Sequence, residues 1–169
     1  LNETLPDVIA ALGAEGVSIH VTHLAGLRDA DAVRQRYAAA GIDADVHAFL
    51  SDMASIYAQT DFAIARAGAA TCTELAVCGV PALLIPLPTA VRDHQMLNAM
   101  ALAKNGGVAV QPQQMLTVEW CVEYLRSRIQ DPGTIEAMRN QLRGTIPADG
   151  ASRLADLVER AADGGKENP

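Results

Sequence analysis

The feature that most constrains this fold is a strand–turn–helix pattern that occurs twice in succession over residues 61–98. In the first copy, an apolar run with strand character, Phe62–Ala65, leads through a turn into a helix expected over Thr71–Cys78. Gly79 is expected to end that helix, since helices commonly end on a glycine in the left-handed conformation. The turn, residues 66–70, consists mostly of small residues, so little bulk would hold a ligand away from the backbone.

The second copy begins with another buried run, Val80–Ile85, and passes through Pro86 and Pro88 to a helix start expected near residues 92–95. Two successive crossovers put two helix N-termini at the carboxyl edge of one parallel sheet, where open α/β sheets bind ligands. A helix N-terminus presents unpaired N–H groups and partial positive charge. The pattern therefore predicts a phosphate or nucleotide site at this edge.

The rest of the chain continues the alternation of strands and helices, which predicts an α/β, Rossmann-like doubly wound parallel sheet. The domain is expected over residues 1–162, and a polar, glycine-rich tail over 163–169 is expected to be disordered. Further strands are expected over Val17–His23, Val46–Phe49 and Val108–Val110. Further helices are expected over residues 2–12, Asp29–Ala40, up to Ala58 with Ser51 as N-cap, up to Lys104, over Thr117–Arg128, from Pro132, and over Ala151–Ala162.

One strand of the expected sheet has no counterpart in the sequence. Such a unit normally begins with a strand and a glycine-rich turn, whereas this chain begins at the helix that would follow them. In the strand order 3-2-1-4-5-6 the first strand lies in the middle of the sheet. Its absence would leave unpaired backbone between the second and fourth strands. We therefore expect that the sequence has been cut from a longer one on its N-terminal side.

Composition argues against several classes of partner and site. The net charge of −7 and the pI of about 4.9 oppose binding to nucleic acid or anionic lipid. The three cysteines show no CxxC spacing, as expected for reduced thiols in a cytosolic protein. No apolar run approaches the roughly 20 residues of a membrane span. His20 and His23 are expected on opposite faces of a strand, and nothing has the ligand clustering of a metal site.

Residues 66–102 closely resemble the MurG family of bacterial UDP-N-acetylglucosamine transferases. The similarity extends to Leu1-Asn2, to His23-x-x-Gly26 and to the turn 49–53, so it runs from Leu1 to about Ala162. The family pattern comprises Arg-Ser/Ala-Gly-Ala-x-Thr-x-x-Glu, Gly-x-Pro-Ala and Asp-His-Gln-x-x-Asn-Ala. The matching residues are Arg66, Ala67, Gly68, Ala69, Thr71, Glu74, Gly79, Pro81, Ala82, Asp93, His94, Gln95, Asn98 and Ala99.

The resemblance implies the C-terminal, donor-binding domain of a two-domain GT-B glycosyltransferase. Its reaction would be inverting transfer of N-acetylglucosamine from UDP-N-acetylglucosamine to undecaprenyl-pyrophosphoryl-muramyl-pentapeptide, which converts lipid I to lipid II without a metal or other cofactor. The glycine-rich loop, the acceptor site, the membrane contact and the general base would lie outside this chain, which should be inactive alone. The resemblance further implies an enzyme at the cytoplasmic face of the plasma membrane.

The resemblance also assigns the nucleotide contacts. Glu74 would accept hydrogen bonds from both ribose hydroxyls, although Thr71 and Glu74 also have the spacing of a helix capping box. Backbone N–H groups of Gly68, Ala69, Ala70 and Thr71 would bind the diphosphate, although these residues could also form only a tight helix start. The Leu50 backbone would read the uracil edge. By residue type alone Leu50, Phe49 and Met53 would be core residues.

Polar residues at the start of the next helix would bind the sugar. His94 and Gln95 are the expected N-acetylglucosamine contacts, with Asn98 on the same helix face. The alternative is a polar helix start that Asp93 caps. Arg66 could neutralise phosphate or form an ion pair with a carboxylate such as Asp93.

Three other functions compete with the donor-domain interpretation. A UDP-N-acetylglucosamine 2-epimerase shares the fold, but such enzymes carry Thr-Glu-Arg-Pro-Glu where this chain has residues 93–95. A split transferase would use this half as a separate subunit, although the missing strand argues against it. A non-catalytic nucleotide-binding module would use Thr71 and Glu74 only as a cap.

Overall fold

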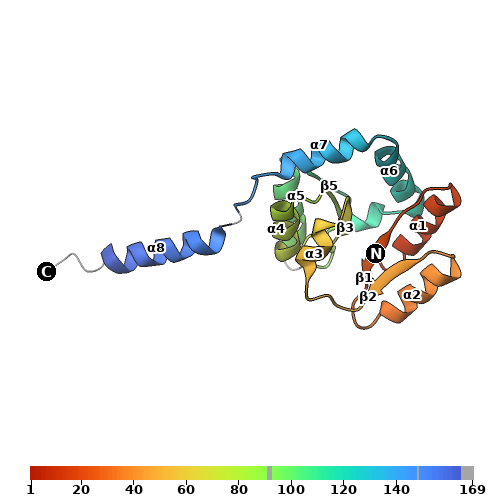
Figure 1. Cartoon of the computed structure of the whole chain (residues 1–169), viewed down its shortest axis with the longest axis horizontal. Coiled ribbons are helices and arrows are strands. Elements are labelled where there is room, and N and C mark those ends of the chain that lie inside the picture. The colour runs from red at the N-terminus through yellow and green to blue at the C-terminus, as the bar shows by residue number, and fades with distance from the viewer. Residues whose placement is uncertain (91–92, 148, 165–169) are drawn as a thin grey trace.

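Within the described residues, 1–90, 93–147 and 149–164, the computed structural model has five short strands, all in parallel pairs, in two sheets (Figure 1). The smaller sheet pairs β1 (Val21–Leu24) with β2 (Ala44–His47). The larger sheet has the order β3-β4-β5, over Ala63–Ala65, Ala82–Leu84 and Val108–Val110. Helices alternate with these strands along the chain, which confirms the expected parallel α/β class.

Helices cover both sheets, and the last one projects from the body (Figure 1). That helix, α8, leaves its large apolar side chains exposed at Leu154, Leu157 and Val158. No described helix has the length and hydropathy needed to cross a bilayer. The helices are α1 (Leu5–Ala14), α2 (Ala30–Ala39), α3 (Met53–Ala58), α4 (Ala69–Cys78), α5 (His94–Ala103), α6 (Val118–Gln130), α7 (Pro132–Leu142) and α8 (Gly150–Gly164), with a 3₁₀ turn over Gln113–Met115.

The position between the two sheets is where the sequence analysis expects an open strand position. In the described part of the chain, β1 pairs only with β2, and β3 pairs only with β4. Asn2 Nδ2 donates to the Ala25 carbonyl, just past β1, at 2.9 Å. Leu1 lies within electrostatic reach of Arg66, just past β3. Leu1 and Asn2 therefore lie between the carboxyl ends of β1 and β3.

The central strand of the larger sheet is buried on both faces, because successive side chains of a strand point to opposite sides. Leu84 packs into a cluster with α4 and α5. Leu83 and Ile85 pack into a second cluster with α1 and α6. All three side chains are fully buried. This strand thus joins the two apolar layers and holds the carboxyl edge of the sheet in place.

Several expected boundaries are confirmed. Gly79 adopts the left-handed conformation (φ 66°, ψ 35°) and ends α4 as expected. The strand Val108–Val110 and the proline at the start of α7 are also as expected. The start of α5 is described from His94, whereas Arg92 lies outside the described residues. The expected tail is described only to Gly164, within α8, and residues 165–169 lie outside the description.

Other boundaries differ from the expectation, for reasons of local hydrogen bonding and pairing. Gly13 lies inside α1, and Gly16 (φ 83°) supplies the left-handed turn. The strand expected over Val46–Phe49 begins and ends two residues earlier, because Ala44 pairs with Val21 of β1. The first strand itself begins only at Val21.

Two expectations near α2 and α3 are wrong. The helix expected over Asp29–Ala40 begins one residue later and ends one residue earlier, so α2 ends at Ala39 and leaves Ala40 exposed. The N-cap of α3 is Asp52 and not Ser51, because the Asp52 carboxylate accepts the Ser55 N–H at 3.1 Å.

Candidate functional site

The site is built on the two helix starts that follow β3 and β4. Gly68 is the N-cap of α4, with an extended backbone (φ −64°, ψ 150°) and no side-chain cap hydrogen bond. The first intrahelical bond runs from Cys72 N–H to the Gly68 carbonyl. The N–H groups of Ala69, Ala70 and Thr71 therefore precede the helical ladder, and they point out of the helix end. The helix supplies a row of donors and partial positive charge.

Glu74 does not form the capping box that its spacing from Thr71 allows. Thr71 is the third residue of α4 and not its N-cap. The Glu74 carboxylate instead accepts a hydrogen bond from the hydroxyl of Tyr57, on α3, at 3.1 Å. The side chain of Glu74 is exposed. The capping interpretation is therefore wrong, and the carboxylate faces solvent beside α3.

Tyr57 is the residue of this site that the sequence analysis missed. Its ring is half-buried against the apolar cluster under α4. Burial, followed by the negative charge of Glu74, raises the pKa of the Tyr57 hydroxyl to about 12. No local pattern signals this contact, because it joins two helices across 17 residues of sequence.

Arg66 ties together the ends of two strands. Its Nη1 donates to the Ile85 carbonyl at 3.1 Å, and the Ile85 N–H donates to the Ala65 carbonyl at 2.8 Å. The expected ion pair with Asp93 is wrong, because Arg66 makes no ion pair with a described carboxylate. Burial lowers the pKa of the Arg66 guanidinium. The arginine thus fixes the edge of the larger sheet while carrying a positive charge there.

The start of α5 uses its amides to fasten neighbouring loops. Gln95 Oε1 accepts the Leu87 N–H at 2.9 Å, and Asn98 Nδ2 donates to the Ala67 carbonyl at 3.1 Å. Asp93 occupies the N-cap position with φ 56°, but its side chain makes no cap hydrogen bond. His94, the first residue of α5, is exposed. Asn98 therefore holds α5 against the turn before α4, which brings the two helix starts together.

The loop after β2 supplies the remaining predicted contact. Leu50 is half-buried there, between β2 and the N-cap of α3. The neighbouring Phe49 side chain is 75% exposed, so its assignment to the core is wrong. Because α3 follows this loop and carries Tyr57, the Leu50 turn and Glu74 are linked through one short helix.

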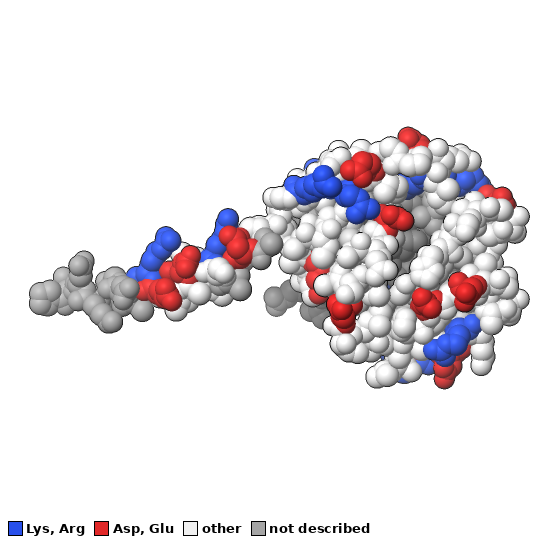
Figure 2. Space-filling view, viewed as in Figure 1, with Lys and Arg blue, Asp and Glu red and all other residues white. Residues whose placement is uncertain are grey.

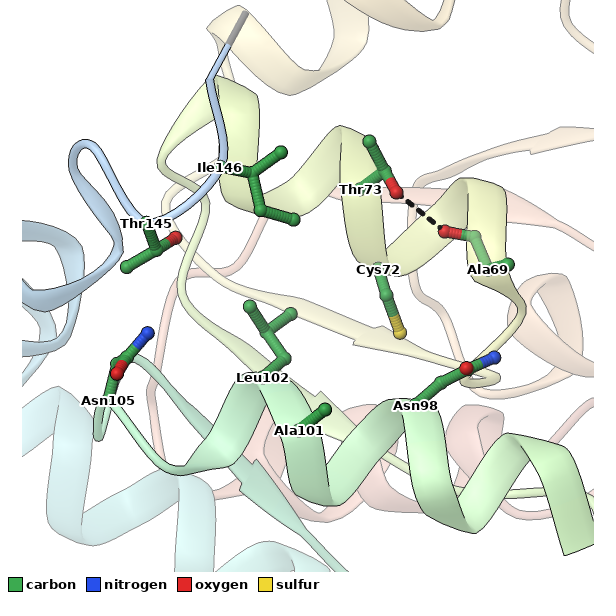
Figure 3. A pocket seen from close by; sticks show the side chains of 9 residues that line it. All are labelled: Ala69, Cys72, Thr73, Asn98, Ala101, Leu102, Asn105, Thr145 and Ile146. Atoms are coloured by element: carbon green, nitrogen blue, oxygen red, sulfur yellow. Dashed lines mark hydrogen bonds between the residues drawn. The ribbon is translucent and has the colours of Figure 1, made fainter. Parts of the chain in front are cut away.

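Two hollows lie near this edge. One, of about 310 Å³, is lined by residues that follow β4 and β5 and by the start of α5: Pro86, Leu87, Pro88, Ala90, Asp93, Met96, Pro112, Gln113 and Gln114. The other, of about 320 Å³, lies between α4 and α5 (Figure 3) and is lined by Ala69, Cys72, Thr73, Asn98, Ala101, Leu102, Asn105, Thr145 and Ile146.

Glu74 does not line the hollow between α4 and α5. Cys72 points into it (Figure 3), and Glu74 is two residues further, which is about 200° around an α-helix. Of the predicted site residues, only Ala69 and Asn98 line this hollow. The first hollow, whose lining follows β4 and β5, lies at the carboxyl edge of the larger sheet, and Glu74 lies on the side of α4 that contacts Tyr57 of α3.

Two further features of the described residues are their potential metal ligands and the distribution of their basic side chains. No group of three or more His, Cys, Asp or Glu in the described residues is arranged to hold a metal ion. His20 is exposed near Asp45, at 3.4 Å, whereas His23 is buried. On the face in Figure 2, most described Lys and Arg side chains lie beside Asp and Glu side chains. The N-terminus of α4 and the Arg66 guanidinium supply positive charge at the site.

Comparison with known proteins agrees with this geometry. The chain is 43% identical over 162 residues to the UDP-N-acetylglucosamine–N-acetylmuramyl-(pentapeptide) pyrophosphoryl-undecaprenol N-acetylglucosamine transferase of Thiobacillus denitrificans, covering 96% of this chain and 43% of that protein. It is 40% identical to the protein of the same name from Bordetella pertussis, covering 96% and 44%. The chain thus spans less than half the length of these curated relatives.

Solved structures give the same result. The crystal structure of Acinetobacter baumannii MurG matches with a TM-score of 0.82 and 31% identity, over 95% of this chain and 48% of that one. A glycosyltransferase of kitacinnamycin shares the fold at a TM-score of 0.64 and 23% identity, over 94% and 38%. These neighbours confirm the expected fold class, an α/β domain of the GT-B glycosyltransferases. The model of the glycosyltransferase family 28 C-terminal domain matches residues 1–158, and the chain belongs to that family.

Proposed function

We propose that this chain is the donor-binding half of an inverting UDP-N-acetylglucosamine transferase that completes a lipid-linked peptidoglycan precursor. Its substrates would be UDP-N-acetylglucosamine and undecaprenyl-pyrophosphoryl-muramyl-pentapeptide. The family membership and the relatives' names support this reaction. The observation that carries it is the open N-terminus of α4, with the Glu74 carboxylate beside it and engaged by Tyr57 instead of by the helix end.

The diphosphate would bind the N–H groups of Ala69, Ala70 and Thr71. Gly68 supports this assignment, because its φ is negative and an added Cβ would meet only Thr71 Oγ1, at an ordinary 3.6 Å. The fold itself therefore does not require glycine at this position. A phosphate lying against the backbone would require it, since a Cβ would hold the anion away from the amides.

The nucleoside and the sugar would extend to either side of the diphosphate. The Glu74 carboxylate would accept hydrogen bonds from the two ribose hydroxyls, and the Leu50 backbone would contact the uracil edge. His94 and Gln95 would contact the N-acetylglucosamine, with Asn98 holding their helix in position. Arg66 would add positive charge at the edge where the diphosphate lies.

In the reaction, an acceptor hydroxyl would attack the anomeric carbon from the face opposite UDP. The bond between that carbon and the phosphate oxygen breaks, its electron pair stays on UDP, and the anomeric configuration inverts. Negative charge on the departing UDP would be stabilised by the α4 N-terminus, with no cofactor. The base that takes the acceptor proton would lie in the other half of the protein.

The other half would also supply the acceptor site and the membrane contact, at the cytoplasmic face of the plasma membrane. We further propose that a strand preceding Leu1 fills the position between β1 and β3. Parallel strands are followed by helices that begin at the carboxyl edge, and α1 begins there, between Ala25 and Arg66.

Affinity for UDP tests the proposed site. In a full-length transferase carrying this chain as its C-terminal half, Glu74→Ala should weaken UDP binding by about ten- to a hundredfold, as expected for hydrogen bonds to a charged group. Glu136→Ala, on α7, is the matched control and should bind UDP normally. Unchanged UDP affinity in Glu74→Ala would remove Glu74 from the site. Absence of sugar transfer by the unsubstituted full-length protein would favour a non-catalytic nucleotide-binding module.

A further inference from the structure

We infer that Tyr57 is a positioning residue for the donor nucleotide, whose hydroxyl holds the Glu74 carboxylate in the orientation that receives the ribose. This inference rests on the proposed function, because it needs Glu74 to bind the ribose. It adds a residue to the site that neither the sequence pattern nor the helix start contains. Tyr57 itself would not touch the substrate.

The Tyr57 and Glu74 side chains differ in how firmly their surroundings hold them. The Tyr57 ring is half-buried and packs against the apolar cluster formed by α4, α5 and the larger sheet. Glu74 is exposed on the side of α4 that faces α3. An exposed glutamate samples several rotamers and loses that freedom when it binds a ligand. A hydrogen bond from a fixed ring therefore removes part of this entropic cost before the nucleotide arrives.

The contact leaves the carboxylate with enough acceptor capacity for the ribose. An ionised carboxylate has two oxygens and about four lone-pair positions. Tyr57 donates to Oε2 of Glu74, at 3.1 Å. Oε1 and the remaining position on Oε2 are then available for two vicinal hydroxyl donors. The tyrosine thus orients the acid without occupying the oxygens that the ligand needs.

The protonation state of Tyr57 fits this role. Burial and the nearby negative charge of Glu74 raise the pKa of its hydroxyl to about 12. The hydroxyl therefore keeps its proton throughout the physiological range and acts as a donor to the carboxylate. A deprotonated, negatively charged Tyr57 would repel Glu74 and the diphosphate. The elevated pKa prevents this repulsion by keeping the hydroxyl neutral.

Removing only the hydroxyl tests the inference in the full-length protein. Tyr57→Phe keeps the ring against its cluster, so the melting temperature should stay close to that of the unsubstituted protein. The KM for UDP-N-acetylglucosamine and the Kd for UDP should rise by about three- to tenfold, the loss expected for one hydrogen bond. The kcat should not change, since the lost interaction contributes equally before and during the reaction.

Tyr124→Phe is the matched control. It deletes a buried hydroxyl on α6 that has no hydrogen-bond partner among the described residues. Its KM and Kd should stay unchanged.

A nucleotide without ribose hydroxyls tests whether Tyr57 acts through Glu74 and the ribose, or acts on another part of the ligand or on the fold. With 2′,3′-dideoxy-UDP, Tyr57→Phe and the unsubstituted protein should bind equally weakly, because Glu74 has nothing to accept. In a Glu74→Ala background, Tyr57→Phe should cause no further loss of UDP affinity. An equal loss with UDP and with the dideoxy analogue would overturn the inference, since Tyr57 would then act on another part of the ligand or on the fold.

The inference and the proposed function fail in different ways. If Glu74→Ala binds UDP normally, the proposed ribose site is wrong and the role of Tyr57 falls with it. If Glu74→Ala weakens UDP binding while Tyr57→Phe leaves it unchanged, the ribose site stands and only the positioning role is wrong. A threefold or larger, ribose-dependent loss in Tyr57→Phe supports the inference.

Discussion

The two sheets of this molecule are stabilised in different ways. In the larger sheet, β4 is buried on both faces between two apolar clusters, and its side chains have no exposed surface. In the smaller sheet, β1 buries one side chain out of four, and that residue is His23. Its Nδ1 lies 3.0 Å from the Tyr37 hydroxyl and its Nε2 lies 3.2 Å from Asn2 Oδ1. The larger sheet thus depends on apolar volume, whereas the smaller sheet combines an apolar cluster that includes Val33 and Val46 with a buried polar network.

The polar network has a definite hydrogen-bond direction. Asn2 Nδ2 donates to the Ala25 carbonyl and to Asp29 Oδ2, which leaves Asn2 Oδ1 as an acceptor. His23 must then carry its proton on Nε2 and accept from Tyr37 at Nδ1. The neutral ring thereby ties the start of α1 to β1 and α2. From this comparison we expect the stability of the larger sheet to respond to changes of side-chain volume. The stability of the smaller sheet should respond also to changes of charge and backbone conformation.

The largest expected effect comes from two leucines that each end a strand. Leu84 of β4 is fully buried, whereas Leu24 of β1 is 42% exposed. Leu84→Ala should lower the free energy of unfolding by about 2–5 kcal/mol, because it removes buried atoms and leaves a cavity. Leu24→Ala should cost less than about 1 kcal/mol, since much of its side chain already contacts water. Equal losses in urea unfolding would end the proposed contrast between the sheets.

Two glycines give the next largest effect, with different causes in the two regions. An added Cβ at Gly107, before β5, would overlap the Leu142 side chain and approach the Met138 carbonyl to 3.0 Å. Gly107→Ala should therefore cost about 1–3 kcal/mol through overpacking. Gly26, after β1, has free space around it but a φ of 83°, so Gly26→Ala should cost about 1 kcal/mol of backbone strain.

Asparagine distinguishes these causes, because it tolerates the left-handed conformation better than alanine but is larger. Gly26→Asn should be more stable than Gly26→Ala, whereas Gly107→Asn should be less stable than Gly107→Ala. Thermal unfolding of the four variants provides the measurement. The same order at both positions would contradict the proposed difference.

A smaller effect concerns pH and the network around His23. Burial lowers the pKa of His23. The folded chain therefore favours the neutral ring. The contribution of the neutral His23 ring to the free energy of unfolding should be complete above the ordinary histidine pKa of about 6.5. It should decrease as the pH falls below that value. The groups facing the ring are Tyr37 and Asn2, with Asp29 behind Asn2.

Urea unfolding between pH 7.5 and 5.5 measures this dependence. His23→Gln should reduce it, since the substituted side chain cannot take up a proton in the unfolded state. His20→Gln is the control, because His20 is exposed and lies just before β1. If the pH dependence of unfolding remained in His23→Gln and disappeared in His20→Gln, His23 would not be the titrating group.

The larger sheet was the more predictable region, for a physical reason. Its central strand lies in an apolar run between Gly79 and Pro86, so burial on both faces is visible in the sequence. The expected strand Val108–Val110 and the helix end at Gly79 agree with the structure. The position of β2 could not be read from the sequence, because its pairing with β1 sets its register.

In the candidate site, the sequence predicts the helix starts but not the hydrogen-bond partners of the side chains. Both helix starts follow from strand–turn–helix patterns. The start of α5 at His94 lies within the predicted range, whereas α4 begins at Ala69, two residues before the predicted Thr71. The partners of Glu74 and Arg66 are set by tertiary contacts, with Tyr57 on a different helix and with the Ile85 carbonyl on the next strand. The spacing of Thr71 and Glu74 fits a capping box, but the helix begins three residues too early to use it, because its N-cap is Gly68.

The smallest expected effect lies in α3, which connects the two sheets and carries Tyr57. The sequence favours Ser51 as its N-cap, whereas in the structure Asp52 accepts the Ser55 N–H. Asp52→Ala should speed hydrogen exchange at the Ser55 amide and leave global unfolding almost unchanged, because α3 is short and none of its side chains is fully buried. Ser51→Ala should leave that exchange rate unaltered. Faster exchange in Ser51→Ala alone would restore the sequence-based cap, and it would mean that the link between the sheets begins one residue earlier.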